Sequence, residues 1–171
     1  MYDATGAVLH RLSRLLALAG GLVLVALIAL TATSIAGRGL IAFGLDAVPG
    51  DFELVEAGAA FAVFSFMPWC QLNRGHMTVD IFAGLFGRRL NAAIDLASAL
   101  LLTAVTGLLA WRHMLGMLDR RAYEEVSFIL QLPLWWFYAA SLAGLVLFVA
   151  TSLFSVWQAA RALPAAFGAA R

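Results

Sequence analysis

Four stretches of the chain are long enough and apolar enough to cross a lipid bilayer as helices. They cover about residues 15–37, 55–73, 91–111 and 134–158. A spanning helix needs about 20 mainly apolar residues, because each adds about 1.5 Å across a hydrocarbon core of about 30 Å. The last span is placed after Pro133, because proline suits a first helical turn and disfavours helix just before it. The pattern predicts an all-α integral membrane protein, with one four-helix domain over residues 1–171.

The first span follows two arginines and therefore resembles the start of a signal peptide. Its uncharged run over residues 15–37 is longer than a signal-peptide apolar region of about 7–15 residues. We therefore interpret it as a retained transmembrane helix.

Arginines in the connecting segments predict how the helices are oriented, because basic residues are enriched in cytoplasmic loops. With the N-terminus inside, the inner segments hold seven arginines: Arg11, Arg14, Arg74, Arg88, Arg89, Arg161 and Arg171. The outer loops hold four: Arg38, Arg112, Arg120 and Arg121. Both termini are therefore predicted to be cytoplasmic.

Two connections have the pattern of segments that lie along the membrane surface. Between residues 39 and 52, apolar residues alternate with glycine, aspartate and proline. Residues 79–86 place Val79, Phe82, Leu85 and Phe86 at helical spacing, directly before Gly87 and two arginines. Such short amphipathic pieces are predicted to contact membrane lipids, with the arginines toward lipid phosphates.

Composition supports a membrane protein and excludes several other classes. Hydrophobic residues make up 63% of the 171 positions and charged residues 12%, whereas soluble domains carry roughly a quarter charged residues. The net charge of +1 indicates no nucleic-acid partner. A single cysteine, Cys70, excludes an internal disulfide.

Small residues predict where helices approach one another closely. Gly58 and Ala62 are four residues apart in the second span, and Ala140 and Gly144 are four apart in the fourth. This spacing puts both members of a pair on one helix face and permits close backbone contact. The alternative for each pair is ordinary alanine-rich composition.

No ionisable side chain lies deep in any predicted span. A charge at the bilayer centre costs roughly 2.5–3.5 kcal/mol on insertion scales and marks an ion or substrate path where it is kept. The pattern therefore argues against a self-contained pump, channel or carboxylate carrier. Asp95 is the nearest exception, either as a first-turn acid favoured by the helix dipole or as a partner for Arg74 or a neighbouring subunit.

The densest polar stretch is Asn73–Asp80, directly after the second span. If it is helical, His76 and Asp80 share a face at i,i+4 and can pair. If it is a turn, Thr78 or Asp80 caps the following segment. Either way we interpret Arg74, His76 and Asp80 as a structural or adhesive anchor.

Histidine placement bears on a possible haem, since a bis-histidine haem needs two ligands at matching depth. His76 is predicted on the inner side and His113 on the outer side, while His10 lies in the N-terminal tail. This arrangement does not assemble a haem site. The sequence also contains no metal-ligand spacing, no nucleophile beside a base and no phosphate loop, so we predict no cofactor, no metal site and no enzymatic activity.

Two acids, Glu53 and Glu56, open the second span and are spaced to face one side. They are either a solvated helix start favoured by the dipole or contacts with a partner protein.

These features resemble the small membrane subunit (DctQ-like) of tripartite ATP-independent periplasmic (TRAP) transporters. The acidic pair opens the second span, which runs into Asn-Arg-Gly-His-Met-Thr-Val-Asp at residues 73–80, similar to the family's Arg-Gly-x-His-(Ile)-x-Val-Asp pattern. Here Gly75 and His76 are adjacent, one residue tighter than that pattern. The last span opens with Pro-Leu-Trp-Trp-Phe-Tyr at residues 133–138, similar to the family's Pro-x-Trp-x-x-Tyr entry.

The resemblance implies a role in a sodium-coupled transporter of organic acids, such as C4-dicarboxylates, in the bacterial inner membrane. The implied partners are a large membrane subunit (DctM-like) that carries substrate and a periplasmic substrate-binding protein (DctP-like). The small subunit would brace the large one, which agrees with spans that lack a polar site. For the sites, we predict that Arg74, His76 and Asp80 form the polar anchor, and that Glu53 and Glu56 contact the large subunit or the binding protein.

Two other functions compete with this interpretation. Membrane anchors of respiratory oxidoreductases are also small four-span subunits, and a haem absorbance that depends on His76 would favour that class. A small self-assembling exporter usually carries a membrane-embedded acid, which these spans lack.

Overall fold

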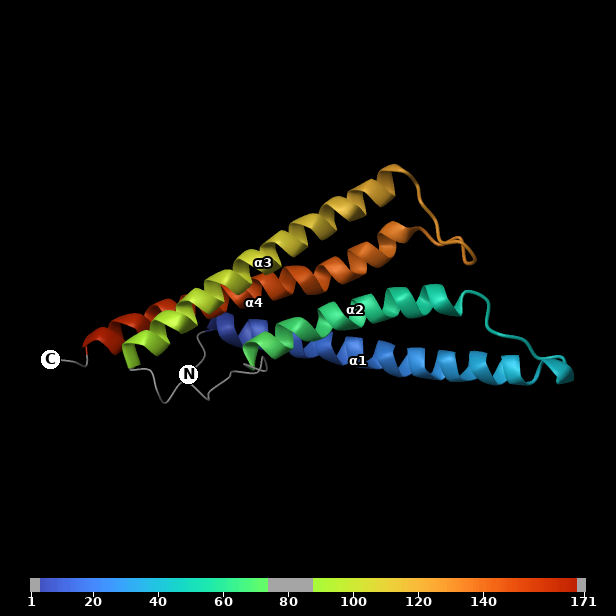
Figure 1. The fold of residues 1–171 in the computed structure, drawn as a ribbon, viewed down its shortest axis with the longest axis horizontal. Helices are drawn as coiled ribbons and strands as arrows, with labels where there is room; N and C mark the ends of the chain where they lie inside the picture. Colours follow the sequence, from blue (N-terminus) through green and yellow to red (C-terminus); the bar gives the residue numbers. More distant parts are fainter. Residues whose placement is uncertain (1–3, 74–87, 169–171) are drawn as a thin grey trace.

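The computed structural model describes residues 4–73 and 88–168. In these ranges the chain forms four long α-helices and one short 3₁₀ helix (Figure 1). Their bounds are α1 Ala4–Gly39, η1 Ile41–Phe43, α2 Asp51–Leu72, α3 Arg88–Ala122 and α4 Leu134–Gly168. Each of the four α-helices is long and apolar enough to cross a bilayer. The predicted all-α, four-span fold is therefore confirmed.

Three helices extend beyond the apolar stretches that predicted them. Helix α1 begins at Ala4 rather than near Leu15, α3 continues past Trp111 to Ala122, and α4 continues past Gln158 to Gly168. Arginine, alanine and leucine are good helix formers, so the helix persists where hydropathy falls. Helix α4 begins at Leu134, as the preceding proline predicts.

The helices form two antiparallel hairpins that meet through their second members. Helix α1 packs against α2, α3 packs against α4, and α2 lies along α4, giving the order α1–α2–α4–α3 (Figure 1). Helix α1 also touches α4 at a few positions, whereas no contact joins α1 and α3 within the described ranges. The start of α1 and the end of α4 lie at one end of the molecule, which we call the terminal end. The two hairpin connections lie at the other, which we call the loop end.

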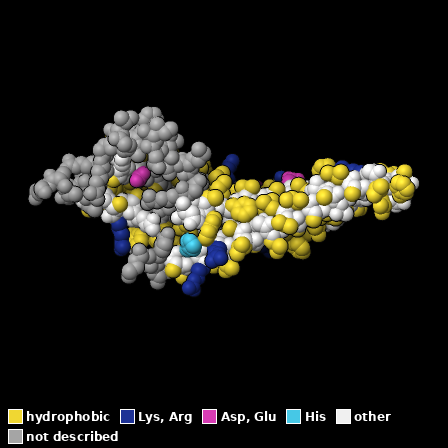
Figure 2. Space-filling model, turned by 90° about the horizontal axis from the view of Figure 1, so that it is seen from below, with side chains coloured by type: hydrophobic (Ala, Val, Ile, Leu, Met, Phe, Trp, Pro, Cys, Tyr) yellow, Lys and Arg dark blue, Asp and Glu magenta, His cyan; other side chains and the backbone are white. Residues whose placement is uncertain are grey.

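Small polar side chains fill much of the buried interior, while the outer surface is apolar. The buried serines and threonines are Ser13, Ser34, Ser65, Thr106, Ser127, Ser141, Thr151 and Ser152. Large aliphatic side chains such as Leu22 and Ile28 are exposed instead, and hydrophobic side chains cover much of the described surface in Figure 2. This distribution suits helices in lipid, where small residues at the interfaces allow close packing.

A close approach between the hairpins is made by Gly144 of α4 against the backbone of α2. A Cβ atom added to Gly144 would lie 2.5 Å from the carbonyl oxygen of Phe64. That carbonyl lacks its usual intrahelical donor, because residue 68 is a buried proline without an N–H. Pro68 thus frees a backbone oxygen, and only glycine leaves room for it to face α4.

Small residues also set the α1–α2 contact. A Cβ added to Gly20 would lie 2.9 Å from Ser65 Cβ, and Ala62 is almost fully buried. Gly58 faces Leu27 of α1. Of the four small residues predicted to mark helix faces, Gly58, Ala62 and Gly144 therefore lie at helix contacts. Ala140 is exposed.

Hydrogen bonds between side chains add to the α4 contacts. Gln71 Nε2 donates to Ser155 Oγ at 3.0 Å, which joins α2 to α4. Thr106 and Ser152 share a buried hydroxyl–hydroxyl bond of 3.2 Å, which joins α3 to α4. Such bonds contribute on average about 0.6 kcal/mol each in membrane helices, so they support the packing rather than dominate it.

Candidate functional site

The polar side chains at the loop end make the main long-range contacts of charged groups in the described chain. Asp51, the first residue of α2, accepts hydrogen bonds at Oδ2 from Ser34 Oγ and from the Arg38 guanidinium, both at 2.5 Å. The guanidinium of Arg38 also lies 5.4 Å from the centroid of the Phe52 ring. The first turn of α2 is thereby fastened to the last turns of α1. An acid at this position is also favoured by the positive end of the α2 dipole.

Glu53, two residues further along α2, holds the connection between α3 and α4. Its Oε1 accepts the backbone N–H of Ile129 at 2.6 Å and its Oε2 accepts that of Leu130 at 3.0 Å. Gly50 permits this approach, because a Cβ there would lie 2.5 Å from Leu130 Cγ. Gly50 also adopts φ +75°, which favours glycine. We call this contact the Glu53 clamp, comprising Glu53, Ile129 and Leu130.

The clamped connection is itself closely bonded. The backbone N–H of Ser127 donates to the carbonyl of Leu132 at 2.8 Å, and Ser127 Oγ accepts the N–H of Leu132 at 3.2 Å. Val126 and Pro133 form an isolated antiparallel bridge. Arg120 pairs with Glu125 where α3 ends. The connection is therefore a defined turn rather than a loose loop.

The three sequence-predicted site residues in the described ranges, Glu53, Glu56 and Asp95, are not gathered at one place. Glu53 lies in the clamp, whereas Glu56 is exposed one turn further along α2. Asp95 is exposed on α3 near the terminal end, away from both. Helix α3 begins at Arg88, so Asp95 lies beyond the first turn, where a helix dipole acts most strongly.

The predicted polar anchor of Arg74, His76 and Asp80 lies outside the described residues. The same is true of the amphipathic segment predicted at residues 79–86. At the edge of this region, the backbone N–H and the side-chain Nδ2 of Asn73 both donate to the carbonyl of Trp69, at 3.1 and 2.9 Å. Asn73 is thus the C-cap residue of α2, which ends at Leu72.

Sequence reasoning singled out Glu53 but missed its neighbours. The roles of Asp51, Ser34 and Arg38 depend on the return of α2 along α1, which pairs residues about one helix length apart. An acid directly after Gly50, opposite an arginine at the end of the preceding span, was the available signal.

Two of the three histidines lie in the described chain, and both pack against aromatic rings. His113 stacks on Tyr138 with ring centroids 4.9 Å apart, and its Nε2 lies 3.1 Å from the Tyr138 carbonyl oxygen. His10 lies against Trp69 at 4.7 Å. No group of three or more histidine, cysteine, aspartate or glutamate side chains suited to a metal occurs in residues 4–73 and 88–168.

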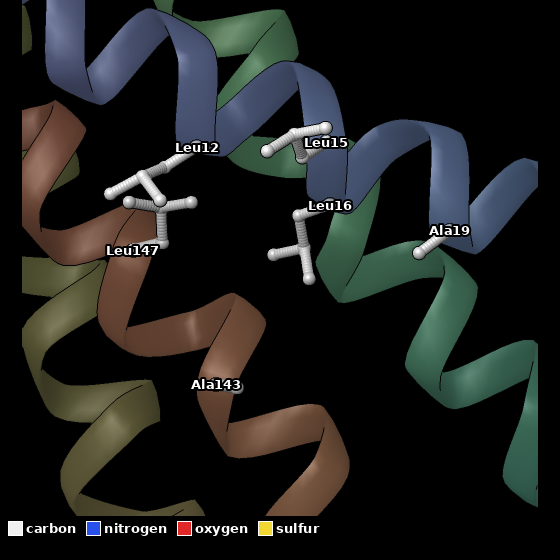
Figure 3. A pocket seen from close by; sticks show the side chains of 6 residues that line it. All are labelled: Leu12, Leu15, Leu16, Ala19, Ala143 and Leu147. Atoms are coloured by element: carbon white, nitrogen blue, oxygen red, sulfur yellow. The ribbon is translucent and has the colours of Figure 1, made fainter.

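A shallow groove of about 420 Å³ lies between α1 and α4 near the terminal end (Figure 3). Six aliphatic side chains line it: Leu12, Leu15, Leu16, Ala19, Ala143 and Leu147. A carboxylate bound there would meet no donor from these side chains. The groove is therefore unsuited to an organic acid.

Four apolar helices and an apolar exterior, with the ion pairs Arg38–Asp51 and Arg120–Glu125 at the loop end, define a multi-span α-helical membrane protein. The family model of the DctQ component of tripartite ATP-independent periplasmic transporters matches residues 27–162. The match covers most of the chain, which therefore belongs to this family: it is a small membrane subunit of a TRAP transporter. Comparison with curated proteins and with solved structures finds no further match.

Membership in this family places the chain among transporter components rather than among the respiratory anchors considered from its sequence. The DctQ component works together with the DctM and DctP components of the transporter.

Proposed function

We propose that this chain is the non-transporting brace of a sodium-coupled TRAP transporter for organic acids, with C4-dicarboxylates as the leading substrate class. In this role it holds the large DctM-like subunit in the bacterial inner membrane, while a DctP-like protein delivers the substrate. One observation carries the proposal: the buried polar residues in the described ranges are serine, threonine and glutamine, and none is charged. An organic acid crossing the membrane needs paired or coordinated charge along its path.

The contacts made by the buried polar groups support the same role. Thr106, Gln71 and Ser152 bond to other helices or to their own helix backbone, so they hold helices together instead of facing an open site. The groove between α1 and α4 is aliphatic. The extensive apolar outer surface is then available to lipid and to the large subunit.

We place both termini on the cytoplasmic side. The connection between α1 and α2 and the connection between α3 and α4 share one end of the bundle, and they carry fewer arginines than the terminal segments and the connection between α2 and α3. Fusion of alkaline phosphatase to the C-terminus is expected to give no activity, whereas fusion within residues 44–49 should give activity. The reverse pattern would show that the orientation is inverted.

Arg74, His76 and Asp80 remain our proposed anchor to lipid or to the large subunit, and Glu56 and Asp95 remain proposed partner contacts through their exposed carboxylates. Glu53 remains a proposed contact as well, alongside its bonds within the chain. His76→Ala or Asp80→Ala is expected to lower recovery of the complex without changing which acid is transported. A changed substrate preference would show that these residues belong to the binding site.

The decisive experiment separates the subunits. The tagged chain, extracted in mild detergent from cells that express the whole transporter, should recover the large subunit. Vesicles that contain both subunits and the binding protein should take up the acid when a sodium gradient is applied, and vesicles without this chain should not. Sodium-driven uptake by this chain alone would overturn the proposal.

A further inference from the structure

Phe128, in the connection between α3 and α4, is the most exposed large hydrophobic residue in the described chain. Its exposed fraction is 95%, and the neighbouring Ile129 is 55% exposed. Leaving such large apolar side chains in water is unfavourable, because transfer of apolar surface out of water is favourable. In a membrane protein, such side chains can leave water by entering the lipid bilayer. The position of Phe128 and Ile129 therefore bears on where the bilayer surface lies.

The exposure of Phe128 is fixed by the turn that carries it. Gln131 has φ +53° and donates from Nε2 to the carbonyl of Phe128 at 3.1 Å. Glu124, on the other side of the turn, also has a positive φ. The Glu53 clamp holds the backbone N–H groups of the next two residues. Phe128 is therefore directed outward by a bonded turn and by a contact with α2.

The other connection at the loop end presents apolar side chains in the same way. Phe43, in η1, is 82% exposed, and Phe52, on the first turn of α2, is 72% exposed. We define the apolar rim as six exposed residues: Ile41, Phe43, Leu45, Phe52, Phe128 and Ile129. Two connections that are far apart in sequence thus both present exposed apolar side chains at the loop end.

Arginines and tryptophans mark the surroundings of the rim. The guanidinium of Arg38 lies over the Phe52 ring, and that of Arg121 lies 5.3 Å from the centroid of the Trp135 ring. Tryptophan prefers the membrane–water interface, and arginine extends from there toward lipid phosphates. Helices α2 and α4 both begin here, so the bilayer surface must cross the chain at this end.

We infer that the apolar rim is a lipid anchor that enters the headgroup region of the bilayer, and that the Glu53 clamp sets the depth of Phe128 within it. The occupant is phospholipid: acyl chains meet the six apolar side chains, and phosphates meet Arg38 and Arg121. The clamp couples this depth to α2, so the α3–α4 connection is held at the level where α2 enters the membrane.

Depth can be measured with a nitroxide attached at Phe128→Cys in a Cys70→Ser background. The full-length chain is placed in vesicles of phosphatidylethanolamine and phosphatidylglycerol, both alone and together with the large membrane subunit. Contact with dissolved oxygen reports lipid, and contact with a water-soluble nickel chelate reports water. Val25→Cys, exposed on α1, is the lipid reference, and Glu124→Cys, in the same turn as Phe128, is the water reference.

The inference predicts that the label at residue 128 favours oxygen over the nickel chelate in both preparations, at a ratio between those of the two references. A label that favours the nickel chelate would overturn it, because the rim would then lie in water. Loss of contact with both reagents when the large subunit is present would also overturn it, because protein would then cover the rim. Neither result depends on whether transport requires this chain.

The role of the clamp is tested by adding Glu53→Gln, with Glu56→Gln one turn away as the matched control. Releasing the connection should raise nickel contact at residue 128 several-fold, whereas the control should leave it unchanged. Unchanged contact in Glu53→Gln would show that the carboxylate does not set the depth.

Discussion

The middle of the bundle and its loop end are fastened by opposite kinds of chemistry. In the middle, α2 and α4 meet where Gly144 faces a carbonyl that Pro68 has freed. At the loop end, Asp51 and Glu53 bind groups on other segments through charge-assisted hydrogen bonds. The first contact depends on the absence of side-chain atoms and the second on charge, so the two should respond to different substitutions.

The largest effect is expected for Gly144→Ala. The added methyl group would collide with the backbone of Phe64, and overpacking of this kind costs about 1–3 kcal/mol. The thermal midpoint of the detergent-solubilised chain should fall accordingly. Gly107→Ala is the matched control, because nothing lies within 4 Å of its added methyl group and alanine improves helix propensity. An equal loss in both variants would refute the close α2–α4 contact.

A smaller and more local effect is expected for Glu53→Ala. The bundle should stay folded, since the clamp touches only the connection between α3 and α4. Amide hydrogen exchange at Ile129 and Leu130 should rise toward the rate of an open loop, while exchange within α4 stays slow. Glu56→Ala, at an exposed acid on the same helix, should change neither. Continued protection of both amides in Glu53→Ala would show that Glu53 does not hold this connection.

Thr106→Val tests whether polar bonds matter in the middle of the bundle. The substitution keeps the shape of the side chain and removes its hydroxyl bond to Ser152. A loss of about 0.6 kcal/mol is expected, the average for hydrogen bonds between membrane helices. A double-mutant cycle with Ser152→Ala isolates the pair. A coupling free energy larger than the stability lost in Gly144→Ala would show that polar bonds stabilise the bundle more than close packing does.

The smallest effect is expected for Arg38→Gln at the loop end. Nearly half of the Arg38 side chain is exposed, and pairs in contact with water contribute little. Asp51 also keeps its bond from Ser34. The thermal midpoint should move less than in Gly144→Ala, and its dependence on salt should weaken. A salt dependence equal to that of the unaltered chain would show that the pair is already screened.

The spans and the start of α4 could be predicted from the sequence, because each depends on a local pattern that allows only one structure in a membrane. Uncharged stretches of about 20 residues must span, and Pro133 marks the start of α4. The helix ends were harder to predict, because the residues beyond Trp111 lower hydropathy without breaking a helix. Hydropathy therefore located the spans but not the full length of α1, α3 and α4.

The contacts between segments were largely beyond sequence reasoning. Glu53 and Ile129 are separated in sequence by most of two spans. No local sequence pattern near either residue predicts their contact. Glu53 was expected to meet a partner protein, and that expectation stays a prediction beside its bonds within the chain. Gly144 was singled out as a small residue, but its tie to Pro68 depends on how the hairpins align. The expected anchor of Arg74, His76 and Asp80 remains a prediction.

The order α1–α2–α4–α3 arranges the helices in an open row rather than in a closed bundle. The row has two broad sides, and α1 also touches α4 near the terminal end. A protein that packs against one side would leave the opposite side exposed to lipid along its whole width. In the proposed brace, four long helices would support a larger subunit without enclosing any part of it.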